Sequence, residues 1–79
     1  RPANYTETAR EKGTQGRVKL VVEFSETGKV NLIYILQALP NGLTESSIST
    51  ARQIKFQPEQ KNGKPVSVIK IIEYSFELF

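Results

Sequence analysis

Few side chains in this sequence could do chemistry, because the usual catalytic and metal-ligating residue types are missing. The 79 residues include no Cys, no His and no Asp, so all eight acidic residues are Glu. Without Cys or His there is no thiol nucleophile, no imidazole base and no zinc site built on sulfur or nitrogen ligands. Without Asp, calcium loops and Walker-type magnesium sites lack their usual ligands. Twelve Ser and Thr remain with only seven Lys to act as bases, so the sequence predicts no enzyme, no metal site and no cofactor.

The length predicts one small domain with a thin core. A chain of this size buries only about 60–65 % of its unfolded surface, and no disulfide is available to reinforce it. Leu, Ile, Val and Phe nevertheless make up 23 of the 79 residues, which is above the roughly 20 % that marks disordered chains. No apolar run approaches the roughly 18 residues of a membrane span, and because the first residue is not Met, we expect a fragment of a longer chain.

The net charge of +3 is concentrated in residues 1–19 and 52–70, which each carry five basic side chains. These stretches could meet an anionic partner such as nucleic acid or a lipid surface, or they could form an ordinary solvated surface. No aromatic residues are interleaved with them in a pattern typical of base recognition, so we expect the solvated surface and no nucleic acid.

The first periodic segment is a short helix that begins at the cap Asn4 and ends at Gly13. Glu7 is expected to complete a box-like pairing with the cap, and Gly13 can take the left-handed conformation that closes a helix. Tyr5 and Ala9 lie four residues apart on its only apolar side. An isolated helix this short is marginal, so these two residues must dock it on the rest of the chain.

A β-hairpin is predicted next. Residues 17–24 alternate, so that Val18, Leu20, Val22 and Phe24 face one way. Gly28 suits a positive φ in a short bulged loop, and residues 31–36 return as the second strand. Because this second strand is apolar on both parities, we expect it in the middle of the sheet, or with one face covered by another chain.

A second helix is predicted to begin at the N-cap Thr44, with Leu43 and Ile48 at the spacing of a hydrophobic staple, and to fade by residues 54–56. Residues 57–65 then form a polar turn region rich in Pro, Asn and Gly. The last segment, residues 66–79, alternates as a strand about 45 Å long at ~3.3 Å per residue, too long for the hairpin to pair completely.

This order of helix, strand, strand, helix and long strand predicts an α+β fold. We expect two layers, with both short helices packed on one face of a three-stranded antiparallel sheet and the long C-terminal strand at an edge. That edge could be protected by Lys70, Glu73 and Glu77. It could instead accept a strand from a partner, or exchange strands with a second copy to give a homodimer.

Seven short motifs, in order along nearly the whole chain, resemble the C-terminal domains of TonB proteins. They are residues 4–10, 15–18, 27–30, 43–45, 51–52, 56–58 and 62–66. Thr6 stands where that family prefers a proline at the first helical position. The motif residues with an expected structural role are Tyr5, Ala9, Gly16, Gly28, Leu43, Phe56, Pro58, Gly63 and Pro65.

The resemblance implies that residues 1–79 form a single periplasmic domain of a diderm bacterium, tethered to the inner membrane by a segment absent from this chain. In the family, an N-terminal transmembrane helix joins a proton-driven motor in the inner membrane. The C-terminal domain captures the TonB box, a short extended segment of an outer-membrane transporter, on its last strand. Force passed through this pairing then permits active uptake.

The resemblance and the predicted edge together assign the candidate binding residues. The docking strand is expected at Val66, Ser67, Val68, Ile69, Lys70, Ile71 and Ile72. Pro2 and Ala3 are expected to flank it, because the family places the segment before its first helix near the docking strand. Two other functions remain open at this point: an interaction or scaffold module without a transport role, and a small basic nucleic-acid module using Tyr34.

Overall fold

The central element of the fold is strand β1, Gly16–Phe24, which pairs with a strand on each side. The structure is a computed structural model that describes residues 2–78. Arg1 and Phe79, the last residue of the predicted C-terminal segment, lie outside the described residues. Strict alternation places Val18, Leu20 and Val22 on the buried face of β1, where at most 1 % of each side chain's surface is exposed.

The sheet has the order β2-β1-β5, and both pairings are antiparallel. Strand β2 is Val30–Gln37 and strand β5 is Val68–Phe76. The predicted three-stranded antiparallel sheet with the C-terminal strand at an edge is therefore confirmed. The expectation that the second strand lies in the middle of the sheet was wrong. The hairpin places β2 on one side of β1 and β5 returns on the other, so β2 is an edge strand despite its apolar sequence.

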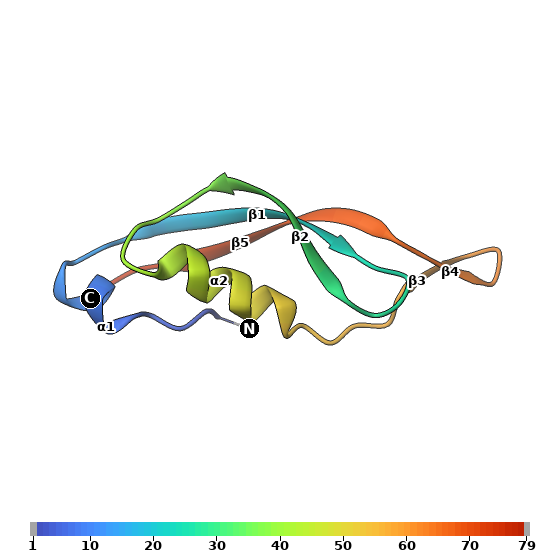
Figure 1. Cartoon of the computed structure of the whole chain (residues 1–79), viewed down its shortest axis with the longest axis horizontal. Coiled ribbons are helices and arrows are strands. Elements are labelled where there is room, and N and C mark those ends of the chain that lie inside the picture. Colours follow the sequence, from blue (N-terminus) through green and yellow to red (C-terminus); the bar gives the residue numbers. More distant parts are fainter. Residues whose placement is uncertain (1, 79) are drawn as a thin grey trace.

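Both helices lie on one face of this sheet (Figure 1). Helix α1 is Glu7–Glu11 and helix α2 is Leu43–Arg52. Ala9 of α1 and Leu43 and Ala51 of α2 are buried beneath the sheet. The apolar core of the described residues consists of Ala9, Val18, Leu20, Val22, Val30, Leu43, Ala51, Tyr74 and Phe76. The two-layer architecture follows from the sequence, because one apolar sheet face and two short apolar helix faces can bury one another.

Helix α1 is capped by Thr6, not by Asn4 as predicted. The Thr6 hydroxyl oxygen accepts a hydrogen bond from Ala9 N at 3.1 Å, which satisfies one of the free N–H groups of the first turn. Asn4 instead belongs to an extended segment, where its carbonyl oxygen accepts a hydrogen bond from the Ser46 hydroxyl at 2.6 Å. The predicted box with Glu7 was therefore wrong, since Thr6 takes the place of the preferred proline and supplies the cap itself.

The predicted end of α1 at Gly13 is confirmed. Gly13 has φ +67°, its N–H donates to Arg10 O, and the N–H of Thr14 donates to Ala9 O. This pair of bonds is a Schellman motif, in which a left-handed residue closes the helix. Tyr5 then docks the helix as expected, because its ring packs edge-on against Phe76 with 5.4 Å between the centroids.

Helix α2 begins two residues earlier than predicted, because its N-cap is Gly42 and not Thr44. Gly42, with φ +83°, precedes its first residue, and Thr44 lies inside the helix. The Thr44 hydroxyl donates to Leu39 O and accepts from Leu39 N, both at 2.8 Å. The prediction of Thr44 as N-cap was wrong, because its hydroxyl group binds the main chain of the preceding loop and does not cap the N–H groups of the helix.

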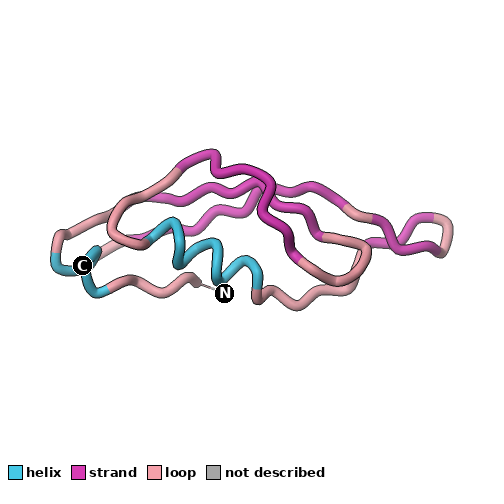
Figure 2. The backbone as a smooth tube through the Cα atoms, viewed as in Figure 1, coloured by secondary structure: helices cyan, strands magenta, loops and turns pink. Residues whose placement is uncertain are grey.

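The predicted turn region at residues 57–65 contains a second, smaller hairpin. Strands β3, Glu59–Lys61, and β4, Lys64–Val66, pair antiparallel. Asn62 and Gly63 connect them with φ values of +55° and +78°, as a type I′ turn requires. This hairpin projects from one end of a molecule that measures 49 × 19 × 17 Å (Figure 2).

Three more of the motif residues with an expected structural role lie in a turn or where side chains pack closely. Gly16 has φ +137°, and a Cβ at this position would lie 3.0 Å from a methyl group of Leu39. Gly28 has φ +88° in the loop between β1 and β2, as predicted. Phe56 packs edge-on against Phe24 at 4.8 Å between centroids.

Gly42→Ala should destabilise the fold more than Gly28→Ala. Both glycines are left-handed, so each alanine should cost roughly 1–2 kcal/mol in backbone strain. A Cβ at Gly42 would also lie 3.0 Å from Cγ2 of Thr6, whereas a Cβ at Gly28 would have no neighbour within 4 Å. We expect about 1 kcal/mol of additional loss at Gly42, measured as the free energy of unfolding in urea.

The double variant Thr6→Ser/Gly42→Ala identifies the cause of that additional loss. Serine keeps the capping hydroxyl and removes Cγ2, so it should recover the additional loss but not the backbone strain. Equal losses in the two single alanine variants would contradict the packing assigned to the Thr6 side chain.

Candidate functional site

The outer edge of β5 is the most regular strand edge of the described residues. Strands β1 and β5 pair without interruption over nine residues, from Gly16 opposite Phe76 to Phe24 opposite Val68. No strand of the described residues pairs with the other side of β5. The main-chain N–H and C=O groups along that side are therefore placed at the spacing that another strand requires.

The opposite edge of the sheet, at β2, is irregular. The pairing of β2 with β1 shifts register between Lys19 and Leu20 and again between Val21 and Val22. Such bulges bend a strand and interrupt its row of hydrogen-bonding groups, which is one way in which proteins prevent unwanted pairing. Of the two edges, only β5 presents a straight template for an added strand.

The side chains of β5 alternate between the two faces of the sheet. Tyr74 and Phe76 are buried on the side of the helices, and Val68 and Ile72 are half-buried there. Ile69 and Ile71 face away from the helices, with 67 % and 64 % of their surfaces exposed. The alternation predicted for residues 66–79 therefore places these two apolar side chains on the face opposite the helices.

Lys70 shares the inner parity of β5 without being buried. Its Nζ lies 5.6 Å from the centroid of the Phe24 ring, close enough for a cation–π contact. The aliphatic part of the chain therefore covers the end of the core while the ammonium group remains in solvent.

The predicted docking strand is divided between two elements. Val68–Ile72 lie on the free edge of β5, whereas Val66 belongs to β4 and pairs with Glu59. Ser67 lies between the two strands, and its hydroxyl oxygen accepts a hydrogen bond from Glu26 N at 3.0 Å. Five of the seven predicted residues thus form one continuous edge, and the other two form the bend that leads into it.

Pro2 and Ala3, the predicted flanking residues, lie beside this edge. Together with residues of β5 they line an open cavity of about 490 Å³ on the helix side of the sheet. Its lining residues are Pro2, Ala3, Phe24, Ile54, Ile72, Glu73, Tyr74 and Ser75. The structure therefore brings the N-terminal segment alongside the second half of β5.

A smaller hollow of about 240 Å³ lies next to the first half of β5. It is lined by Phe24, Phe56, Gln57, Glu59, Val68 and Lys70. Phe24, Ile54, Gln57 and Glu59 were not predicted as site residues. The sequence could not reveal them, because they reach the edge only through the return of β5 alongside β1.

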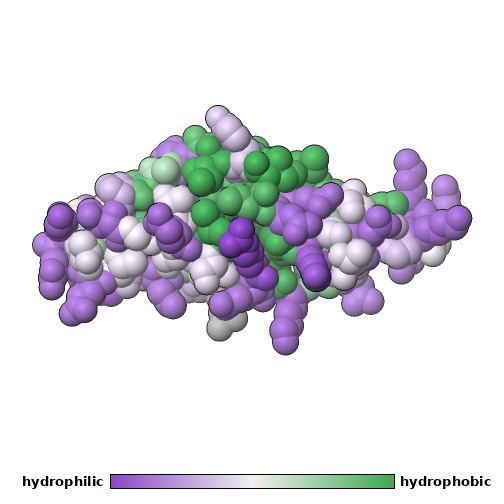
Figure 3. Space-filling view, in the orientation of Figure 1, coloured by the Kyte–Doolittle hydropathy of each residue, from purple (hydrophilic) through white to green (hydrophobic). Residues whose placement is uncertain are grey.

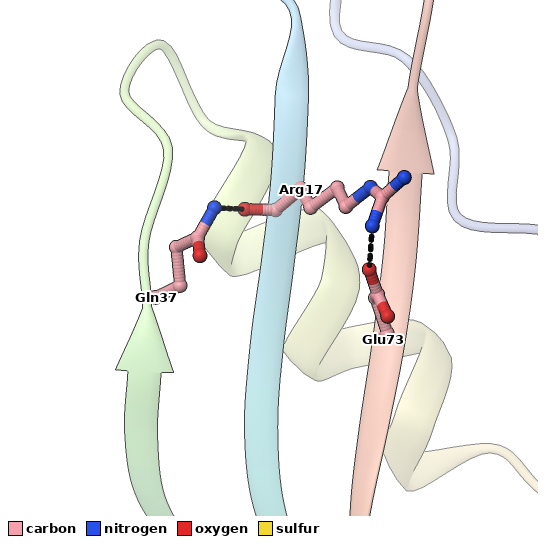
Figure 4. Close-up of polar contacts among 3 residues, drawn as sticks. All are labelled: Arg17, Gln37 and Glu73. Atoms are coloured by element: carbon pink, nitrogen blue, oxygen red, sulfur yellow. Dashed lines mark hydrogen bonds and ion pairs between the residues drawn. The ribbon is translucent and has the colours of Figure 1, made fainter.

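The polar groups on the outer face near the site pair with one another. The Arg17 guanidinium and the Glu73 carboxylate form an ion pair at 3.0 Å on the outer face, and the Gln37 amide donates to Arg17 O at 3.0 Å (Figure 4). Both charged side chains are largely solvated, so this pair adds at most about 1 kcal/mol. Among residues 2–78 no cluster of acidic residues could hold a metal ion, and none of the helices is long and apolar enough to cross a bilayer.

Comparison with known proteins identifies one family. The model of the family described as Gram-negative bacterial TonB protein C-terminal matches residues 1–78, which is essentially the whole chain. No curated protein matches the chain significantly.

Tyr74 should make the stability of the fold depend on pH in the alkaline range. Burial raises the pKa of the Tyr74 phenol above its usual value of 10.0. Because the folded state then holds this proton more tightly than the unfolded state, its contribution is complete below pH 10. It is lost as the pH rises through the folded-state pKa. Above pH 10, the free energy of unfolding should therefore fall more steeply in the parent chain than in Tyr74→Phe.

The control is Tyr34→Phe, which removes a hydroxyl group from a side chain that is 61 % exposed. Urea unfolding at a series of pH values would measure all three chains. Parallel pH profiles for the parent and Tyr74→Phe would contradict the desolvation of this phenol.

Proposed function

The chain belongs to the TonB C-terminal family, and on this premise we propose that its β5 edge captures the TonB box of an outer-membrane transporter. The family's domains are periplasmic in Gram-negative bacteria, interact with outer-membrane transporters and are not enzymes. In our proposal the box adds to β5 as a fourth strand, and the paired strands transmit the force that drives active uptake.

The observation that carries this proposal is the contrast between the two sheet edges. Strand β5 has nine consecutive residues in register with β1 and a free outer side, whereas β2 contains two register shifts. Strand addition requires a straight row of donors and acceptors, since main-chain hydrogen bonds supply most of its affinity. The part of the edge that we assign to docking is Val68–Ile72.

The hollows beside β5 provide the selectivity that main-chain bonds lack. A strand added to β5 would direct alternate side chains toward the helix side, next to the cavities lined by Phe24 and Lys70 and by Ala3 and Ile72. Its remaining side chains would lie beside Ile69 and Ile71 on the outer face. Pro2 and Ala3 retain their assignment as flanking contacts, and Ser67 and Val66 would lie where the added strand leaves the edge.

The expected affinity is modest. Five main-chain hydrogen bonds at roughly 0.5–1.5 kcal/mol each supply about 2–8 kcal/mol, and association itself costs several kcal/mol. Side-chain burial must make up the difference, so we expect dissociation constants in the micromolar range, about −8 kcal/mol. A complex of this affinity can form and dissociate repeatedly during transport.

The antiparallel ladder suits the transmission of force. A pull along a strand added to β5 would load the β5–β1 hydrogen bonds in shear, so that many bonds share the load at once. The load would pass into β1, whose inner-face residues Val18, Leu20 and Val22 are completely buried. We further propose that residues 1–79 are one domain of a longer protein that reaches the inner-membrane motor, which the sequence preceding this chain would test.

Proline substitutions in β5 test the docking edge. Successive N–H groups of a strand point to opposite edges, so one of Ile69→Pro and Lys70→Pro removes an outward donor while the other removes a bond to β1. We expect one variant to fold with an unchanged circular dichroism spectrum and the other to be destabilised by about 3 kcal/mol or more. The folded variant should bind TonB-box peptides at least tenfold more weakly in calorimetry.

The matched control uses the irregular edge. Of Asn31→Pro and Leu32→Pro in β2, the variant that folds should bind the same peptides with the affinity of the parent chain. Parent-like affinity in the folded β5 variant would exclude β5 as the docking strand, and a loss confined to the β2 variant would move the site to the other edge.

A further inference from the structure

The face of the sheet that points away from the helices, here called the outer face, carries an apolar row at its centre. Val21 of β1 lies between Tyr34 of β2 and Ile71 of β5, which are its direct cross-strand partners. Tyr34 and Ile71 expose 61 % and 64 % of their surfaces, although large apolar side chains gain most from burial. Apolar side chains also gather around β2 in the space-filling view, with polar ones toward both ends (Figure 3).

The charges next to this row have opposite signs on its two sides. Lys19 lies two residues before Val21 on the same face of β1, and Glu23 lies two residues after it. Glu23 accepts a hydrogen bond from the Asn31 amide at 3.0 Å. Lys19 forms no ion pair with the described residues, because the Glu73 carboxylate beside it pairs with Arg17 (Figure 4).

We propose that the outer face binds the outer face of a second copy of this chain. The two copies are related by a two-fold axis that lies in the plane of the interface, runs perpendicular to the strands and passes Val21. This rotation reverses the direction of β1, so Val21 meets Val21 of the copy and Lys19 meets Glu23 of the copy, twice. The apolar row stacks on itself in the same arrangement, with Tyr34 over Tyr34 and Ile71 over Ile71.

The charge pattern selects this axis over the alternative. A two-fold axis along the strands would also stack the apolar rows, but it would place Lys19 over Lys19 and Glu23 over Glu23. Like charges that face each other across an interface are unfavourable, whereas opposite charges fix the register. Along β1 the outer face is thus self-complementary in one orientation, as an isologous dimer requires, and this argues for a second copy over an unrelated protein.

The size of the face limits the strength of the dimer. Three strands about 4.8 Å apart, each roughly 30 Å long, give a flat area on the order of 400 Å². Standard interfaces bury about 800 Å² per partner. We therefore expect a weak, reversible dimer that forms at high micromolar concentration. Its contacts are side chains of the outer face, Ile71 among them, so it leaves the main-chain groups of the β5 edge unpaired and does not depend on the proposed function.

A charge swap tests both the dimer and its axis. In sedimentation equilibrium of the 79-residue chain, Lys19→Glu should weaken association about tenfold or more, because it places two carboxylates together at each of two symmetric contacts. The double variant Lys19→Glu/Glu23→Lys restores opposite signs at both contacts and should return the dissociation constant to within about threefold of the parent value. Lys29→Glu, with the same charge change in the exposed β1–β2 loop, should have little effect.

Tyr34→Ser supplies a second test through the apolar row and should weaken the dimer about tenfold, with its fold checked by circular dichroism. A parent chain that remains monomeric at about 1 mM would overturn the proposal and leave the face to some other partner. A dimer that is insensitive to Lys19→Glu, or a double variant that does not recover, would also overturn it and would indicate strand exchange or the other axis.

Discussion

The burial of Val18, Leu20 and Val22 on one face of β1 is the constraint on which the rest of this structure depends. Val18, Leu20 and Val22 can be buried only if both helices lie beneath the sheet, and β1 can stay extended there only if its main chain is paired on both sides. The hairpin supplies one partner and the C-terminal segment supplies the other. Among residues 2–78 the other two strands, β3 and β4, pair with each other, so the outer edge of β5 stays free.

Much of the fold could be predicted because its strongest signals are local. The alternation in residues 17–24, the left-handed glycines Gly13 and Gly28, and the two parities of the last strand each depend on neighbouring residues alone. The edge position of β5 could also be predicted, because three strands always leave two edges. The family resemblance added the identity of the expected partner, which periodicity cannot supply.

The errors arose where tertiary contacts decide between similar local choices. Asn4 and Thr6 are both good caps, and Asn4 is drawn away because its carbonyl oxygen binds Ser46 on α2. Thr44 likewise caps nothing, since its hydroxyl group binds Leu39. The apolar sequence of β2 indicated a central strand. The central strand is instead β1, because β2 pairs with one side of it and β5 with the other. The site hollows beside Phe24 and Ile54 depend on the same long-range return of β5.

The two register shifts in β2 also set how many strands the sheet can accept. A sheet with two straight edges is divalent and can polymerise through edge-to-edge contacts into fibres. Here the bulges leave one regular edge, so the sheet is monovalent for strand pairing. Two copies that paired through their β5 edges would have no second straight edge for further growth. An open edge can therefore persist in this small domain without the covering helix or loop that larger proteins often provide.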